Sequence, residues 1–149
     1  MYLRKSWIYG REGKDTINGG KNDDNIYGGI DNDSINGDKG KDILIGEEGD
    51  DVLNGGLGND LLYGGVGNNT LSGGQGSDRF ILTPFEGINR ITDFDNEDTL
   101  TFVGFSSEEI ELVSNISENM TNIILNSKII AVLENTQITA PNDLNFIEY

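Results

Sequence analysis

The 149-residue sequence contains no cysteine and no histidine. Without cysteine there are no disulfides and no thiolate metal sites. Without histidine, the usual imidazole base of serine and cysteine nucleophiles is missing, and so is histidine-dependent acid–base chemistry. These two absences exclude most familiar active sites, and we expect that the chain is not an enzyme.

Basic residues, aromatic residues and long apolar runs are also scarce. Lys and Arg total 10 against 26 Asp and Glu, which gives a formal net charge of -16, and aromatic residues make up 8%. A surface this acidic repels nucleic acid and anionic membranes and attracts cations. The longest apolar run, Ile129–Leu133, is far shorter than the ~20 residues of a membrane-spanning helix. We therefore predict no nucleic-acid partner and no membrane span.

Glycine is abundant, and it recurs with a strict nine-residue period. Residues 10–81 divide without gaps into eight nonamers, GREGKDTIN, GGKNDDNIY, GGIDNDSIN, GDKGKDILI, GEEGDDVLN, GGLGNDLLY, GGVGNNTLS and GGQGSDRFI. Position 1 is always glycine, position 6 is aspartate or asparagine, and position 8 is Ile, Leu or Phe. A fixed period of this kind indicates a solenoid.

Each nonamer predicts a six-residue turn followed by a three-residue strand. Glycine at positions 1, 2 and 4 permits backbone angles that a side chain would forbid. Asn22 and Asp31, which replace it at position 4, are the types that best tolerate the left-handed region. By strand alternation, position 8 points inward and positions 7 and 9 point outward. Two nonamers then form one coil of 18 residues with a sheet on each side, and each repeat stacks on the next but one.

The nonamers match the pattern GGxGxDxUx and resemble the RTX family, the hemolysin-type calcium-binding repeats, over 72 of the 149 residues. Arg11, Asp38 and Glu47 depart from the pattern at position 2. The resemblance implies an all-β fold, a right-handed parallel β-roll, with Ca²⁺ held between stacked turns by position-6 side chains and turn carbonyls. The implied metal ligands are Asp15, Asp24, Asp33, Asp42, Asp51, Asp60, Asn69 and Asp78.

Eight turns in two columns of four leave three gaps per column, so we expect about six Ca²⁺ ions. One column pairs Asp15 with Asp33, Asp33 with Asp51, and Asp51 with Asn69; the other pairs Asp24 with Asp42, Asp42 with Asp60, and Asp60 with Asp78. Because Asn69 removes one charge, the Asp51/Asn69 site is expected to be the weakest.

The repeat block is predicted to need these ions in order to fold. One inward apolar side chain per nonamer is too little burial to offset the backbone entropy of 72 ordered residues. Stacked carboxylates add repulsion. Ca²⁺ accepts oxygen ligands in flexible geometry, so glycine-turn carbonyls and shared carboxylates suit it better than Mg²⁺ or Zn²⁺. The alternative, that Gly, Asp and Asn only mark solvated turns, does not explain eight copies in one register.

The two outer faces differ at position 9. Residues 1–9 form a degenerate leading repeat, so the even face carries an apolar ladder of Tyr9, Tyr27, Ile45, Tyr63 and Ile81, and the odd face carries Asn18, Asn36, Asn54 and Ser72. Either the carboxy-terminal segment or a partner domain covers the ladder, or its tyrosine rings bind a glycan. In the second case the chain would be an auxiliary polysaccharide-binding module of a secreted carbohydrate-active enzyme.

Residues 82–149 lack the period and are predicted to form a β-rich cap. Strands are expected at Arg90–Phe94 and Thr99–Val103, a short helix at Ser106–Val113, and a hairpin from Asn122–Asn126 and Ile129–Leu133. Asp93, Asp95 and Asp98 either offer a further cation site or are merely solvated.

The stretch INRITDFDNEDTLTF and the finish LNFIEY resemble the region after the repeats in RTX proteases, lipases and alginate epimerase modules. The start of the chain shows no apolar amino-terminal secretory signal. The resemblance implies type I secretion through a carboxy-terminal signal within residues 82–149. It also implies a calcium-binding module that folds on Ca²⁺ outside the cell and supports the secretion and stability of an exported protein.

Overall fold

The computed structural model describes residues 5–84, 87–104, 109–115, 119–136 and 146–148. Residues 1–4 of the leading repeat and 137–145 of the predicted secretion signal lie outside this set. The strands are β1 (Trp7–Glu12), β2 (Thr16–Lys21), β3 (Asn25–Ile30), β4 (Ser34–Lys39), β5 (Ile43–Glu48), β6 (Val52–Leu57), β7 (Leu61–Tyr63), β8 (Thr70–Gln75), β9 (Arg79–Leu82), β10 (Asn89–Ile91), β11 (Thr99–Phe102), β12 (Ile110–Asn115), β13 (Met120–Leu125), β14 (Lys128–Glu134) and β15 (Phe146–Glu148).

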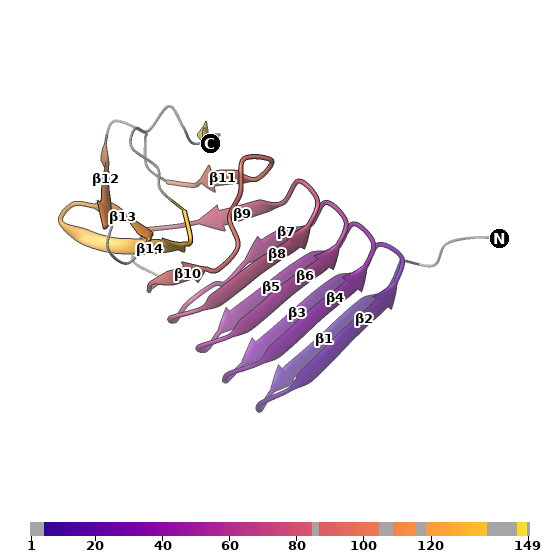
Figure 1. Cartoon of the computed structure of the whole chain (residues 1–149). Coiled ribbons are helices and arrows are strands. Elements are labelled where there is room, and N and C mark those ends of the chain that lie inside the picture. Colours follow the sequence, from indigo (N-terminus) through magenta and orange to yellow (C-terminus); the bar gives the residue numbers. More distant parts are fainter. Residues whose placement is uncertain (1–4, 85–86, 105–108, 116–118, 137–145, 149) are drawn as a thin grey trace.

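The strands of the repeat block alternate between two facing sheets that run the length of the molecule (Figure 1). One sheet has the order β1-β3-β5-β7-β9-β11-β15, and the other begins β2-β4-β6-β8-β10 and continues into β14, β13 and β12. Neighbouring strands of the repeats are parallel, and each residue pairs with the residue 18 positions later, as Ile17 pairs with Ile35 and Ile26 with Leu44. The predicted all-β, parallel β-solenoid with two nonamers per coil is confirmed.

The core is a line of position-8 side chains between the two sheets. All eight are buried, and the cap continues the line because Ile91 pairs with Leu71 and Leu100 with Phe80. Positions 7 and 9 face outward, with Asn25 as a buried exception at position 7. Each strand of the repeats therefore contributes one apolar side chain to the interior, as the sequence predicts.

The strands are longer than the nonamer pattern predicts. A typical strand spans positions 7 to 9 and then positions 1 to 3 of the next nonamer, as in Thr16–Lys21. The extra residues pair as well, for example Lys21 with Lys39, because identical turns stacked in register bring their backbone groups opposite each other. Half of each predicted turn is thus part of the sheet, except for the turn after β7, a strand that ends at Tyr63.

Positive φ angles recur at positions 2 and 4 of the turns in all eight nonamers. Asn22 (φ 86) and Asp31 (φ 80) adopt it at position 4, as predicted. Arg11 (φ 88), Asp38 (φ 74) and Glu47 (φ 75) adopt it at position 2, so these departures from glycine keep the same turn. A non-glycine residue in this region costs roughly 1–2 kcal/mol.

The cap begins with a longer coil and ends in an antiparallel hairpin. The register between β8 and β10 and between β9 and β11 is 20 residues, as Arg90 with Thr70 and Thr99 with Arg79 show. The predicted hairpin is present as β13 and β14, which pair antiparallel, and β14 joins β10 in parallel. Among the described residues, no helix is long and apolar enough to cross a membrane.

The helix predicted at Ser106–Val113 is wrong from Ile110 onward. Residues 105–108 lie outside the described set, and Ile110–Asn115 forms strand β12, paired antiparallel with β13 from Ile110 opposite Leu125. Backbone pairing with the hairpin outweighs the weak helix signal of a serine followed by acidic residues. The cap is consequently sheet where the sequence suggested a helix.

Candidate metal centre

Position-6 side chains form two ladders along the two sides of the roll. In each, the backbone N–H of one position-6 residue donates to Oδ1 of the residue one coil later, for example Asp24 to Asp42 at 2.7 Å and Asp33 to Asp51 at 2.8 Å. The remaining ladder bonds are Asp15 to Asp33, Asp42 to Asp60, Asp51 to Asn69 and Asp60 to Asp78. We name the space between two such residues a gap. In each gap the lower member is the residue earlier in the sequence and the upper member is the residue one coil later.

The second carboxylate oxygen, Oδ2, has no partner in any of the six gaps. Six buried Oδ2 atoms lack a hydrogen bond, namely those of Asp15, Asp24, Asp33, Asp42, Asp51 and Asp60. Each is the lower member of one predicted gap. A buried carboxylate oxygen without a donor carries a large desolvation cost, so this pattern marks six places where a cation would fit.

Position-1 glycine leaves room beside each orphaned oxygen. A Cβ on Gly37 would lie 2.5 Å from Oδ2 of Asp42 and 2.6 Å from the carbonyl oxygen of Gly55, and a Cβ on Gly55 would meet Asp60 and Gly73 in the same way. None of the position-1 glycines has a positive φ. The prediction that position 1 needs glycine for its backbone angle is therefore wrong, because what glycine supplies there is space between two oxygens.

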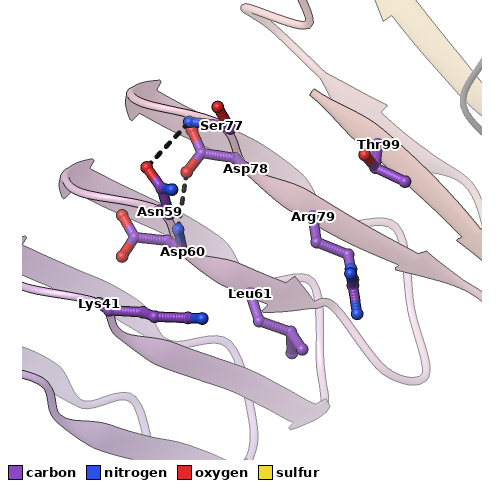
Figure 2. Close-up of a pocket in the computed structure, with 8 residues that line it drawn as sticks. All are labelled: Lys41, Asn59, Asp60, Leu61, Ser77, Asp78, Arg79 and Thr99. Atoms are coloured by element: carbon purple, nitrogen blue, oxygen red, sulfur yellow. Dashed lines mark hydrogen bonds between the residues drawn. The ribbon is translucent and has the colours of Figure 1, made fainter. Parts of the chain in front are cut away.

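Position 5 ties the same turns together on the outside. In Figure 2 the Ser77 N–H donates to Oδ1 of Asn59 at 3.1 Å, next to the Asp60 N–H that donates to Oδ1 of Asp78 at 2.8 Å. Beside them lies a hollow of about 320 Å³ that Lys41, Leu61, Arg79 and Thr99 also line. The position-5 bonds run in the opposite direction to the position-6 bonds, so each of these two turns donates one hydrogen bond to the other.

The oxygen-only lining fits calcium. Each gap brings together one orphaned carboxylate oxygen and the position-1 carbonyl of the next coil. No group of three carboxylate, imidazole or thiolate side chains gathers anywhere in the part of the chain that the structure describes. A gap would therefore complete its ligand set with backbone carbonyls, which suits Ca²⁺ and not Zn²⁺.

Burial perturbs the ladder carboxylates. It raises the pKa of Asp42 and of Asp60 to about 6, opposed by the hydrogen bond from the neighbouring N–H and reinforced by nearby carboxylates. Burial raises the pKa of Asp51 and Asp78 as well. The metal-free ladder thus holds protons more tightly than free aspartate, and a cation in the gap would take the place of such a proton.

Asn69 occupies its predicted place in the ladder but differs in one atom. Its Oδ1 accepts from the Asp51 N–H at 2.9 Å, as an aspartate would. Its Nδ2 takes the position that Oδ2 holds elsewhere, and it faces the carbonyl oxygens of Gly65 at 3.2 Å and Gly67 at 3.5 Å. Asn69 is therefore a donor where the other position-6 residues have an orphaned acceptor.

The cap extends both ladders with residues outside the nonamers. Asp98 is 4% exposed, and its Oδ1 accepts from the Asp78 N–H at 2.8 Å, while Asn89 lies above Asn69. Burial raises the pKa of Asp98 to about 6. Asp93 accepts from the N–H groups of Gly73 and Gly74, so Asp98 and Asp93 are integral to the stack and not merely solvated. The nonamer period does not predict these positions, because the coil that carries them is 20 residues long and not 18.

Stacked coils of this kind define a parallel β-solenoid, and each of its six oxygen-lined gaps could hold a cation. The model of the RTX calcium-binding nonapeptide repeat matches residues 9–44 and 45–80. These residues belong to that family, and the chain carries a calcium-binding repeat module.

A solved structure is also similar to this chain, the R3 subunit of the AlgE6 mannuronan C5-epimerase of Azotobacter vinelandii. The identity is 25%, the match covers 85% of this chain and 78% of that one, and the TM-score is 0.33. Among curated proteins, none matches the sequence.

Proposed function

We propose that this chain is a non-catalytic module that binds one Ca²⁺ in each of its six gaps and folds as it does so. The observation that carries the proposal is the set of six buried, unpartnered Oδ2 atoms, one per gap. The ligands would be Asp15, Asp24, Asp33, Asp42, Asp51 and Asp60 through Oδ2, with the upper residue of each gap closing the ladder through Oδ1.

Coupling between gaps follows from the way the ladder is shared. Asp42, for example, offers Oδ2 to the Asp42/Asp60 gap and Oδ1 to the Asp24 N–H of the gap below. An ion that orders one turn therefore orders an oxygen of the next, and binding should be cooperative along each column. Six ions also carry twelve positive charges into a chain of formal net charge -16, which removes most of its self-repulsion.

Circular dichroism with and without a chelator tests the folding step. We expect the strand signal to rise as Ca²⁺ is added in the 10⁻⁴ to 10⁻³ M range that is typical of extracellular modules, and to vanish in EGTA. Mg²⁺ at equal ionic strength should not replace Ca²⁺, because it demands tight octahedral geometry. An unchanged strand spectrum in EGTA would contradict the proposal.

Export is the setting that we propose for this switch. A calcium-poor cytosol would keep the repeats unfolded, and extracellular Ca²⁺ would fold them after passage, supporting the stability of an exported protein. Cells with a type I exporter should secrete the full chain but not a chain truncated after Ile81. Asp42→Ala should be secreted in normal amount and fold less completely outside, whereas equal secretion of the truncated chain would rule out a carboxy-terminal signal.

A second candidate function, polysaccharide binding, is favoured by the outer face of the first coils. Trp7 and Tyr9 are 59% and 56% exposed, and both rings stack on Tyr27, with interplanar angles of 9° and 14°. Tyr27 and Tyr63 are half-buried, so their rings are not closed off. Two hollows of about 270 and 390 Å³ lie beside Ile30 and are lined by members of the apolar ladder, Tyr9 and Tyr27 in one and Ile45 and Tyr63 in the other.

Binding to a panel of polysaccharides in Ca²⁺ tests this candidate. Tyr9→Ala should weaken retention at least tenfold if sugar rings stack on the platform. Asn18→Ala, on the opposite and polar face, is the matched control and should have no effect. Silence of the whole panel in Ca²⁺ would leave calcium binding as the sole proposed function.

A further inference from the structure

The cap adds one more gap to the column that runs from Asp15 to Asn69. The chemistry of this added gap differs from that of the six gaps in the repeats. Asn89 of the cap lies above Asn69, because the next residue, Arg90, pairs with Thr70 and the Arg90 N–H donates to the Asn69 carbonyl at 2.8 Å. Both residues are buried, at 4% and 1% exposure. The Asn69/Asn89 gap thus continues this column with amides in place of carboxylates, and Asn89 Oδ1 lies beside Gly64 where the gaps below have the position-1 carbonyl of the next coil.

The Asn69 amide nitrogen lies where those gaps have their orphaned oxygen. A Cβ on Gly64 would come within 2.5 Å of Asn69 Nδ2, just as a Cβ on Gly55 would come within 2.5 Å of Asp60 Oδ2. Nδ2 faces three oxygens, the carbonyls of Gly65 and Gly67 at 3.2 and 3.5 Å and Asn89 Oδ1 at 3.4 Å. A donor therefore fills an oxygen-lined space that is otherwise open.

The orientation of this amide is fixed from below. The Asp51 N–H needs an acceptor and takes Oδ1 of Asn69 at 2.9 Å, which turns Nδ2 toward the gap above. Replacing aspartate by asparagine at this position accordingly leaves the ladder bond to Asp51 intact. The atom that changes belongs to the Asn69/Asn89 gap and not to the Asp51/Asn69 gap.

We infer that Asn69 is an amide plug: its NH₂ group takes the place of a Ca²⁺ ion, ends the metal column and joins the cap coil to the repeats without metal. The inference rests on the proposed calcium binding of the gaps below. Asn89 Oδ1 and the two turn carbonyls already supply neutral oxygens. With these oxygens in place, the missing carboxylate of Asn69 is the feature that we expect to keep this gap from being a seventh calcium site.

Counting bound ions in Asn69→Asp tests the plug. The carboxylate should turn an orphaned Oδ2 into the gap, and equilibrium dialysis with metal analysis should find one more Ca²⁺ per chain than in the unmodified protein. Asn68→Asp is the matched control, since it adds the same charge at the adjacent, exposed position 5. It should leave the ion count unchanged.

The complementary variant places an amide in a proposed metal gap. Asp51→Asn should bind one ion fewer than the unmodified chain and keep more strand signal than that chain in EGTA, because its amide can plug the gap while its Oδ1 still accepts from the Asp33 N–H. This comparison decides the question even if Asn69→Asp fails to fold. An unmodified chain that binds Ca²⁺ while Asn69→Asp gains no ion, or Asp51→Asn that loses its strand signal in EGTA as the unmodified chain does, would overturn the plug alone. No Ca²⁺ bound to the unmodified chain would overturn the proposed function itself.

Discussion

The repeat coils and the cap coil continue the same ladders but satisfy them by different chemistry. In the repeats, each gap keeps one buried carboxylate oxygen without a donor. In the cap, Asp98 accepts at both oxygens, from the N–H groups of Asp78 and Asp95, and Asp93 accepts from Gly73, Gly74 and Ser72. The same residue type is thus a candidate metal ligand or a hydrogen-bonded cap, depending on which N–H groups the register brings to it.

The largest expected effect comes from filling a repeat gap with a methyl group. Gly55→Ala would place a Cβ 2.5 Å from Asp60 Oδ2 and 2.6 Å from the Gly73 carbonyl oxygen. We expect one Ca²⁺ fewer per chain by metal analysis and a midpoint for Ca²⁺-induced folding raised about a hundredfold, about 2.8 kcal/mol. Gly20→Ala, where a Cβ meets nothing within 4 Å but φ is +98, should lose some stability and no ion. Equal ion counts in the two variants would contradict the role given to position 1.

Protons should partly replace calcium in the repeats. The pKa of Asp42 and of Asp60 is raised from 3.8 to about 6 in the metal-free fold, so the folded state binds more protons than the unfolded state between these values. The metal-free fold should therefore gain stability as pH falls from 7 toward 4. In EGTA we expect strand signal to return near pH 5, with sedimentation as a control for aggregation. In Ca²⁺ the same acidification should weaken binding, and an absence of both trends would show that these carboxylates are not buried together.

The cap should respond to loss of its own aspartate without any change in metal binding. Asp93→Ala removes the acceptor for two backbone N–H groups and the Ser72 hydroxyl, which should lower the free energy of unfolding by about 2 kcal/mol. Urea titration in saturating Ca²⁺ measures this, and the ion count should stay constant. Asp95→Ala, at an exposed side chain, is the control with a smaller effect. Loss of a bound Ca²⁺ in Asp93→Ala would contradict the assignment of Asp93 to hydrogen bonding alone.

The smallest expected effect is a gain in stability from replacing Glu47 with glycine. Glu47 holds a φ of 75, and glycine there should raise the stability of the folded state by roughly 1 kcal/mol, because the left-handed backbone no longer carries a Cβ. Glu48→Gly removes the same charge at the next residue, where φ is not positive, and should not stabilise the fold. A higher unfolding midpoint for Glu47→Gly alone is the expected result.

The nonamer period was sufficient to predict the repeat coils. Position 8 is buried and position 6 forms the ladders because every coil has the same length, so a residue type at a fixed place in the sequence has a fixed place in space. The period could not show why position 1 is glycine. That reason lies in the contact of Gly55 with Asp60 and with the Gly73 carbonyl of another coil.

The cap was harder to predict because its register changes where the period stops. Asp98 belongs above Asp78 and Asn89 above Asn69 only when the coil is lengthened to 20 residues. The Ser106–Val113 segment resembled a helix locally, and strand β12 forms from its second half because β13 offers an antiparallel edge. The direction of the Asn69 amide depends on the Asp51 N–H, which no local pattern contains.

The stacked pair Trp7 and Tyr27 gives the molecule a built-in optical probe of its far end. Trp7 is the sole tryptophan, and its ring lies 6.2 Å from that of Tyr27 on the following coil, at the end of the roll opposite the cap (Figure 1). Its fluorescence therefore reports when the first two coils come together, whereas the far-ultraviolet spectrum averages over all coils. Comparing the two signals in time after mixing would reveal the direction in which the roll winds up.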